Sequence, residues 1–384
     1  MKKIISLLLV LALCVSFAAC ASAADSNTRT GTTETAAAAA ADAVADETET
    51  ETVTREIRLS DADGSVTITE AGTYRLSGEL SDGQIVVSAQ DAQVTLILDG
   101  VDITAKGTAA IYVAEADKVK IELAEGSENS LRSVGAFSDP ADDGIDAVIF
   151  ARDDVTIKGT GALTVESEQG HGIVSKDDLK ITGGTITVTA AKKGLCGNDS
   201  VEINGGTLRI QAGSDGVHCD TVVTVNGGVL DIRAAEGIEG TYVEINDGDI
   251  TISATDDGIN AARKSTDYEV AIVINGGKLS VTMGSGDTDA LDSNGSITIN
   301  GGTVDINAQF AFDFDTTGTL NGGTVTVNGT QVSSITNAMM GGGFGGRGGM
   351  GGFGGQGGGF GTPPSGGMGG FGNGQTGGGF GGRR

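Results

Sequence analysis

The chain has 384 residues, of which 51 are acidic and 24 are basic, so its formal net charge at pH 7 is −27. This charge argues against nucleic acid or an anionic lipid surface as the principal partner, because both would be repelled. It favours instead the binding of multivalent cations.

The first residues have the layout of an export signal. Lys2 and Lys3 precede an apolar stretch from Ile4 to Phe17, and small residues surround Cys20. This pattern predicts a signal peptide over residues 1–20. The apolar run is shorter than the ~20 residues that a membrane-spanning helix needs. We therefore expect the mature protein to be extracellular.

Two kinds of processing fit this leader. The segment Phe17–Cys20 resembles a lipobox, which predicts a lipid on Cys20 that anchors a lipoprotein to the outer face of the cytoplasmic membrane. In that case the lipid is the protein's membrane contact. The alternative is ordinary signal-peptidase cleavage after Ala21-Ser22-Ala23, which would release the protein. Residues 21–54 are rich in Ala, Thr and Glu, and predict a disordered tether.

A repeat of about 22 residues dominates the chain from residue 55 to residue 337, and such periods indicate solenoids. Short strand-like segments open this region at residues 65–69, 84–88, 94–98, 109–113 and 118–123. A Gly-Gly or Asp-Gly pair then recurs, usually after Asn, with its second glycine at Gly184, Gly206, Gly228, Gly248, Gly277, Gly302 and Gly323. The spacings are 22, 22, 20, 29, 25 and 21 residues.

Two all-β folds compete to explain this repeat. Asn-Gly between two strands is a strong hairpin signal and would suit an antiparallel meander. However, alignment of the units places Asn on Asn, Gly on Gly and aliphatic on aliphatic, which stacked identical coils explain directly. We therefore predict a parallel β-helix with coils of about 22 residues, glycines with positive φ at its corners, and an asparagine ladder along its axis.

A second column of the alignment predicts the core. In each unit an apolar residue follows a small residue, and we expect these side chains to point inward: Ile145, Ile173, Leu195, Val217, Ile238, Ile259, Leu291 and Phe312. A solenoid needs burial only between neighbouring coils, so a chain with few aromatic residues can still be stable.

Acidic residues flank the second column on successive coils. Stacking would bring these carboxylates close together, which is tolerable mainly if cations lie between them. Calcium prefers such oxygen ligands. We therefore predict that Ca²⁺ binds a subset of these acids; a solvated acidic edge is the alternative. The candidates are Asp143, Asp146, Asp215, Asp220, Glu236, Glu239, Asp256, Asp257, Asp287, Asp289 and Asp292.

Basic residues gather just before this acidic region. They could line one patch that binds the carboxylate of a uronic acid, or they could neutralise the neighbouring acids. The candidates for substrate binding are Arg152, His171, Lys176, Lys192 and Lys193. Cys196 and Cys219 lie on neighbouring coils, one register position apart, and a disulfide between them stays open. Residues 338–384 are mainly glycine and predict a disordered tail.

The exported leader, the Asn-Gly-Gly coils with Asp-Asp-Gly-Ile turns and the Gly-rich tail together resemble a bacterial extracellular carbohydrate-binding domain family. Its fold is a pectate-lyase-like right-handed parallel β-helix, and the resemblance covers roughly residues 55 to 330. It implies calcium in the coils and binding of cellulose and acidic sugars. The chain has no tryptophan and four tyrosines, so a flat aromatic strip for cellulose is not available. Acidic polysaccharide is therefore the favoured ligand.

Three functions follow as hypotheses. The first is a monomeric, non-catalytic, calcium-dependent protein that binds an acidic, pectin-like polysaccharide or another plant cell-wall glycan. The second is a calcium-dependent polysaccharide lyase, with Lys176 and Lys193 eligible as the base that removes a proton. The third is a structural surface adhesin.

Overall fold

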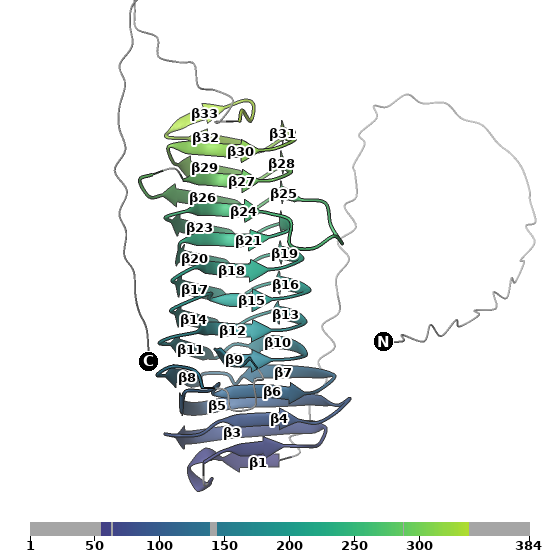
Figure 1. The fold of residues 1–384 in the computed structure, drawn as a ribbon, viewed down its shortest axis with the longest axis vertical. Coiled ribbons are helices and arrows are strands. Elements are labelled where there is room, and N and C mark those ends of the chain that lie inside the picture. The colour runs from purple at the N-terminus through teal and green to yellow at the C-terminus, as the bar shows by residue number, and fades with distance from the viewer. Residues whose placement is uncertain (1–54, 63, 139–143, 287, 338–384) are drawn as a thin grey trace, which may run out of the picture. The chain divides into compact units, whose positions relative to one another are not determined.

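The computed structural model describes residues 55–62, 64–138, 144–286 and 288–337, which form stacked coils of short strands (Figure 1). The predictions for residues 1–54 and 338–384, and those for Asp143 and Asp287, lie outside these ranges. Within the described ranges, no helix has the length and apolar character needed to cross a membrane.

The strands form three faces, and the equivalent strands of successive coils pair in parallel. Face 1 contains β1 (Arg55–Arg58), β7 (Lys118–Leu123), β10 (Asp154–Gly159), β13 (Asp178–Ile181), β16 (Ser200–Ile203), β19 (Val222–Val225), β22 (Tyr242–Ile245), β25 (Ala271–Ile274), β28 (Ser296–Ile299) and β31 (Thr317–Leu320). Face 2 contains β8 (Glu128–Val134), β11 (Ala162–Ser167), β14 (Thr185–Ala190), β17 (Thr207–Ala212), β20 (Val229–Ala234), β23 (Asp249–Ala254), β26 (Lys278–Met283), β29 (Thr303–Asn307) and β32 (Thr324–Val327). Face 3 is an 11-stranded sheet of β2 (Val66–Ile68), β4 (Ile85–Ser88), β6 (Ile111–Glu115), β9 (Ala147–Ala151), β12 (His171–Ser175), β15 (Leu195–Gly197), β18 (Asp215–Cys219), β21 (Glu236–Gly240), β24 (Asp257–Ala261), β27 (Asp289–Ser293) and β30 (Phe310–Phe314).

The two ends of the solenoid depart from this regular pattern. Near the N-terminal end, β3 (Gly72–Leu80) and β5 (Gln93–Lys106) are long strands that continue from face 1 into face 2, since β5 pairs first with β7 and then with β8. A short 3-10 turn, η1 (Leu59–Asp61), follows β1. At the other end, β33 (Thr330–Val332) pairs antiparallel with β32. Among the strand pairs described, the others are parallel, so the predicted parallel β-helix is confirmed.

The repeated Asn and Gly residues lie where the sequence predicts them. The second glycine of each unit has positive φ, from 73° at Gly277 to 117° at Gly248. The asparagines form a continuous ladder in which each side-chain amide donates to the amide oxygen of the preceding coil, at 2.7 or 2.8 Å from Asn226 through Asn321. The ladder and the glycines fix the corner between faces 1 and 2.

The predicted core column on face 3 is confirmed from Ile173 onward, with one correction before it. The side chains from Ile173 to Leu291 are fully buried and Phe312 is 3% exposed. Ile145, however, precedes β9 and is only half-buried, and Ile149 pairs in register with Ile173 instead. The sequence Asp-Gly-Ile-Asp at residues 143–146 resembles the unit motif, but Gly144, Ile145 and Asp146 precede β9 and lie outside the strands of face 3.

The small residue before each member of this column is required by close packing. At Gly216, a Cβ atom would lie 2.3 Å from Ile232 Cγ2 of face 2 and 2.7 Å from the carbonyl oxygen of Gly237 on the next coil. The chain therefore turns both Gly216 and Val217 toward the interior. As a result, Asp215 before the glycine and His218 after the aliphatic residue both face outward.

Replacing Gly216 by alanine is expected to destabilise the protein by about 1–3 kcal/mol, because either the coil or Ile232 must shift. Denaturant unfolding measures the change. Gly284→Ala is the matched control, since its Cβ would meet no atom closer than 3.5 Å. Equal stability of the two variants would contradict this account of the small-residue column.

Candidate binding face

The outer surface of face 3 carries two columns of polar side chains. The register pairs Asp215 with Glu236, and Asp257 with Asp289, in the column before the small residues. The column after the aliphatic residues runs, in order of coils, through Cys196, His218, Glu239, Asn260, Asp292 and Asp313. The expectation that stacking brings these acids together is met from β18 onward.

The central part of the face is a cluster of five charged side chains, three buried and two partly exposed, which we call the ion-pair cluster. His218 Nδ1 lies 2.8 Å from Asp215 Oδ2 and 2.5 Å from Glu239 Oε2. Lys193 Nζ lies 2.7 Å from Asp215 Oδ2, and Lys264 Nζ lies 2.6 Å from Glu239 Oε1. The side chains of Asp215, His218 and Glu239 are each less than a tenth exposed.

These contacts fix the charges of the ion-pair cluster. Burial alone would lower the pKa of His218, but its hydrogen bonds with Asp215 and Glu239 raise that pKa to about 9. Burial would raise the pKa of Asp215, yet hydrogen bonds with His218 and Lys193 hold it well below its ordinary value. Hydrogen bonding to Glu239 outweighs burial and raises the pKa of Lys264. Asp215 is therefore ionised, and His218 and Lys264 are protonated, at neutral pH.

Two acids on the following coils, Asp257 and Asp292, have raised pKa values. Among the described residues, Asp257 and Asp292 form no ion pair with a lysine or arginine. Burial, together with the nearby Asp256 and Asp289, raises the pKa of Asp257 to about 6. Burial and the charges of Asp257 and Asp313 raise the pKa of Asp292 to about 7. Asp257 and Asp289 belong to the first of the two columns, and Asp292 belongs to the second. We refer to these three acids together as the acid column.

An unsatisfied amide lies beside the acid column. Asn260, in register with Asp292, donates its Nδ2 to Glu236 Oε2 at 3.2 Å. Its Oδ1 atom is buried and has no hydrogen-bond partner among the described residues. Burial and the charges of Glu239 and Asp215 also raise the pKa of Glu236, to about 7. Buried oxygens that accept no hydrogen bond are uncommon in proteins and call for an explanation such as a bound ion.

The remaining predicted metal ligands lie at the margins of the face. Asp146 lies outside the regular columns and contacts His171 Nε2 at 3.1 Å and Lys192 Nζ at 3.5 Å. Asp220 is half exposed and lies 3.2 Å from His218 Nε2. Asp256 is exposed in the turn before β24.

The predicted basic patch is divided between the two edges of face 3. His171, Lys192 and Lys193 lie at the edge where its strands begin. Lys193 neutralises Asp215 and is therefore part of the ion-pair cluster. Arg152 and Lys176 follow β9 and β12 at the other edge, where Lys176 Nζ lies 5.5 Å from the centre of the Phe150 ring. Arg152 Nε lies 3.1 Å from the hydroxyl of Tyr112.

The two described cysteines are free thiols. Cys196 belongs to the outer column and pairs in register with His218. Cys219, the residue after His218, pairs with Gly197 and is fully buried in the core. Burial raises the pKa of the Cys196 thiol to about 11 and that of Cys219 to about 12. Both sulfurs are therefore protonated at neutral pH.

Sequence reasoning missed two features of the site. Lys264 belongs to the longer connection between β24 and β25, which has no counterpart in the other units, so no alignment signals its contact with Glu239. A second acidic group, Asp154, Asp177 and Asp178, lies at the turn from face 3 to face 1. The Asp-Asp pairs at residues 153–154 and 177–178 are a repeated signal that could have revealed it. Burial and the charges of Asp154 and Asp199 raise the pKa of Asp177 to about 6.

Comparison with known proteins found a similar protein, a similar solved structure and a matching family model. A protein of Acetivibrio thermocellus, described as a carbohydrate-binding domain-containing protein, is 48% identical over 135 residues, which are 34% of this chain and 47% of that protein. The chain thus matches about half the length of this relative. A solved structure, the gadolinium derivative of a polysaccharide lyase-like protein from C. thermocellum, is 33% identical with a TM-score of 0.42, covering 70% of this chain and 86% of that one. The sequence model of the family described as carbohydrate-binding domain-containing protein matches residues 62–313, more than half of the chain, so the protein belongs to this carbohydrate-binding domain family.

Proposed function

We propose that the protein binds an acidic polysaccharide on face 3 through calcium held by the acid column. The observation that carries this proposal is the buried Asn260 Oδ1, which has no hydrogen-bond donor among the described residues and lies in register with the Asp292 carboxylate. Calcium accepts six to eight oxygen ligands in flexible geometry, from carboxylates, amide oxygens and water. The chemistry of these side chains therefore fits this ion.

Asp257, Asp289, Asp292 and Asn260 would hold the calcium. The ion would neutralise the repulsion between the carboxylates and present a positive charge to a uronic acid. Asp215 and Glu239 of the ion-pair cluster would not bind calcium in this proposal, because lysines and His218 already neutralise them. They would give the face a rigid centre.

Lys192 supports binding of an acidic chain on the same face. Its side chain is half exposed, and its contact with Asp146 is long at 3.5 Å. Exposed ion pairs of this kind contribute little, so the ammonium group can turn to a carboxylate of the glycan. Export to the cell surface with a lipid on Cys20 is part of the same proposal.

Affinity electrophoresis through polygalacturonate, with calcium or with chelator, tests the binding. We expect retardation with calcium and loss of retardation with chelator. Asp292→Asn should weaken retardation, because it removes a charged ligand. Asp305→Asn is the control, since it makes the same change at an exposed position of β29.

Equal retardation with chelator and calcium would contradict the calcium bridge. Loss of retardation in Asp305→Asn as well as in Asp292→Asn would show that overall charge is responsible. Release of unsaturated product, detected by its ultraviolet absorbance, would favour the polysaccharide lyase instead.

A further inference from the structure

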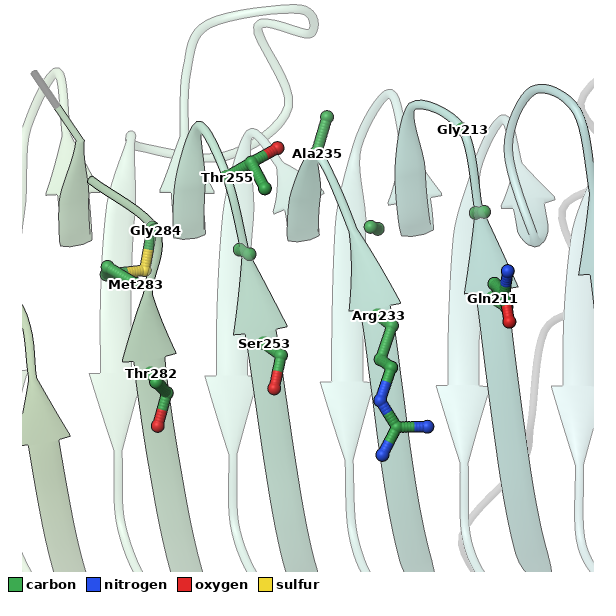
Figure 2. Close-up of a pocket in the computed structure, with 12 residues that line it drawn as sticks. Gln211, Gly213, Arg233, Ala235, Ser253, Thr255, Thr282, Met283 and Gly284 are labelled. Carbon is green, nitrogen blue, oxygen red and sulfur yellow. The ribbon is translucent and has the colours of Figure 1, made fainter. Parts of the chain in front are cut away.

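A groove follows the corner where face 2 turns into face 3, over the coils of β17, β20, β23 and β26. Its volume is about 610 Å³. Figure 2 shows the four strands side by side, with Gln211, Arg233, Ser253 and Thr282 near their ends and Gly213, Ala235, Thr255 and Gly284 just beyond them; Met283 of β26 is labelled as well. The groove therefore crosses the coils and runs along the axis of the solenoid.

One wall of the groove is a column of polar side chains in strict register. Gln211 pairs with Arg233, Arg233 with Ser253, and Ser253 with Thr282. Each coil thus offers one hydrogen-bonding side chain at the equivalent register position. Neighbouring strands lie about 4.8 Å apart, so these side chains repeat at that distance along the groove. This spacing is close to the length of one pyranose unit in an extended polysaccharide.

The chemistry of the groove suits a neutral sugar chain. Gln211, Ser253 and Thr282 are uncharged donors and acceptors, and the charge of Arg233 is opposed by Asp231 Oδ2 at 3.3 Å. Alanines and Met283 in the same strands give the groove an apolar floor, which suits the carbon–hydrogen faces of sugar rings. A second hollow on face 2, of about 340 Å³, continues from the first through Arg233.

We propose that this groove binds a neutral linear polysaccharide along the solenoid axis, with about one sugar residue on each coil. It is distinct from the acid column, although the two are close: Asp257 lies two residues after Thr255, which lines the groove. The acidic glycan and the neutral glycan would therefore use adjacent surfaces with different chemistry. Binding in the groove uses hydrogen bonds and apolar contact, so it requires no calcium.

Affinity electrophoresis through hydroxyethylcellulose and through glucomannan, both with chelator present, tests this inference. The unaltered protein should be retarded by at least one of the two polymers. The double variant Gln211→Ala/Arg233→Ala should bind it about tenfold more weakly, because each lost hydrogen bond leaves a sugar hydroxyl without its partner. Thr282→Ala should reduce binding by a smaller factor.

Arg132→Ala is the matched control. Arg132 belongs to the same register column, since it pairs with Glu166, Glu166 with Thr189, and Thr189 with Gln211, but it does not line the groove. Thermal unfolding checks that each variant is folded; Arg233 is largely exposed, so little stability should be lost.

Three results would overturn the inference. These are the absence of retardation by both neutral polymers, equal binding by the double variant and the unaltered protein, and an equal loss in Arg132→Ala. Asp292→Asn should leave binding of the neutral polymer unchanged, which separates a failure of this groove from a failure of the acid column.

Discussion

Without calcium, the protein is expected to be more stable at pH 5 than at pH 7.5, and calcium is expected to remove most of this difference. The pKa values of Glu236, Asp257 and Asp292 lie at about 7, 6 and 7, above their ordinary values near 4. A folded-state pKa above the unfolded value gives stability that is complete below the unfolded pKa and is lost as pH rises through the folded pKa. The loss should therefore fall between pH 4.5 and pH 7.5.

The expected size is on the order of 3 kcal/mol for the three groups together, after allowance for their mutual coupling and partial exposure. Calcium bound only by the folded protein would offset this loss by an amount that grows with the logarithm of its concentration once that concentration exceeds the Kd. Melting temperatures across this pH range, with chelator and with calcium, measure both effects.

The double variant Asp257→Asn/Asp292→Asn provides the comparison. It should reduce the dependence on pH with chelator, leaving the part due to Glu236 and His218, and should abolish the gain from calcium. The His218 pKa is raised from 6.5 to about 9, so His218 adds a loss of stability that begins near pH 6.5 and continues to about pH 9. The double variant should therefore retain the part of this loss that falls between pH 6.5 and pH 7.5. If stability with chelator were constant over the window, or if calcium gave no gain at pH 7.5, the assignment of the acid column would be wrong.

Asp215→Asn is expected to destabilise the protein by about 3 kcal/mol, because it leaves Lys193 and His218 with one fewer carboxylate in a buried site. It should also lower the pKa of His218 from its present value of about 9. Urea unfolding measures the first effect, and NMR titration of the histidine ring measures the second. The chain has two histidines, so His171→Gln assigns the signals.

Asp220→Asn is the matched control for Asp215→Asn. Asp220 also lies near His218, at 3.2 Å, but its side chain is 52% exposed and water replaces it easily. We expect a loss below about 1 kcal/mol. If both variants lost the same stability, burial would not determine the strength of the ion-pair cluster.

The regular part of the fold was predictable because each residue of a unit repeats the environment of its equivalent. The asparagine ladder, the positive φ at the corner glycines and the buried column from Ile173 to Phe312 follow from this equivalence. Ile145 was placed wrongly because its local sequence resembles a unit while its chain segment is a loop. Only the register, which pairs Ile149 with Ile173, resolves the ambiguity.

The candidate site was predictable only in part, for a related reason. The stacking of Asp257 on Asp289 follows from the repeat, but the difference between neutralised and uncompensated acids does not. That difference depends on which lysines reach which carboxylates, and Lys264 does so from a connection without equivalents. The groove likewise depends on the shape of turns, although the alignment already contains its column of polar residues.

Each coil of the groove contributes one outer polar side chain, so the number of coils determines the number of these side chains. From β7 to β31 each strand pairs only with its equivalents on the two neighbouring coils, so duplication of one whole unit within this part would preserve the pattern of pairing. It would also add one rung to the asparagine ladder and one polar side chain to the groove. The number of sugar residues that the groove can bind would thus change by about one with each coil gained or lost, while the sequence of the other coils stays the same.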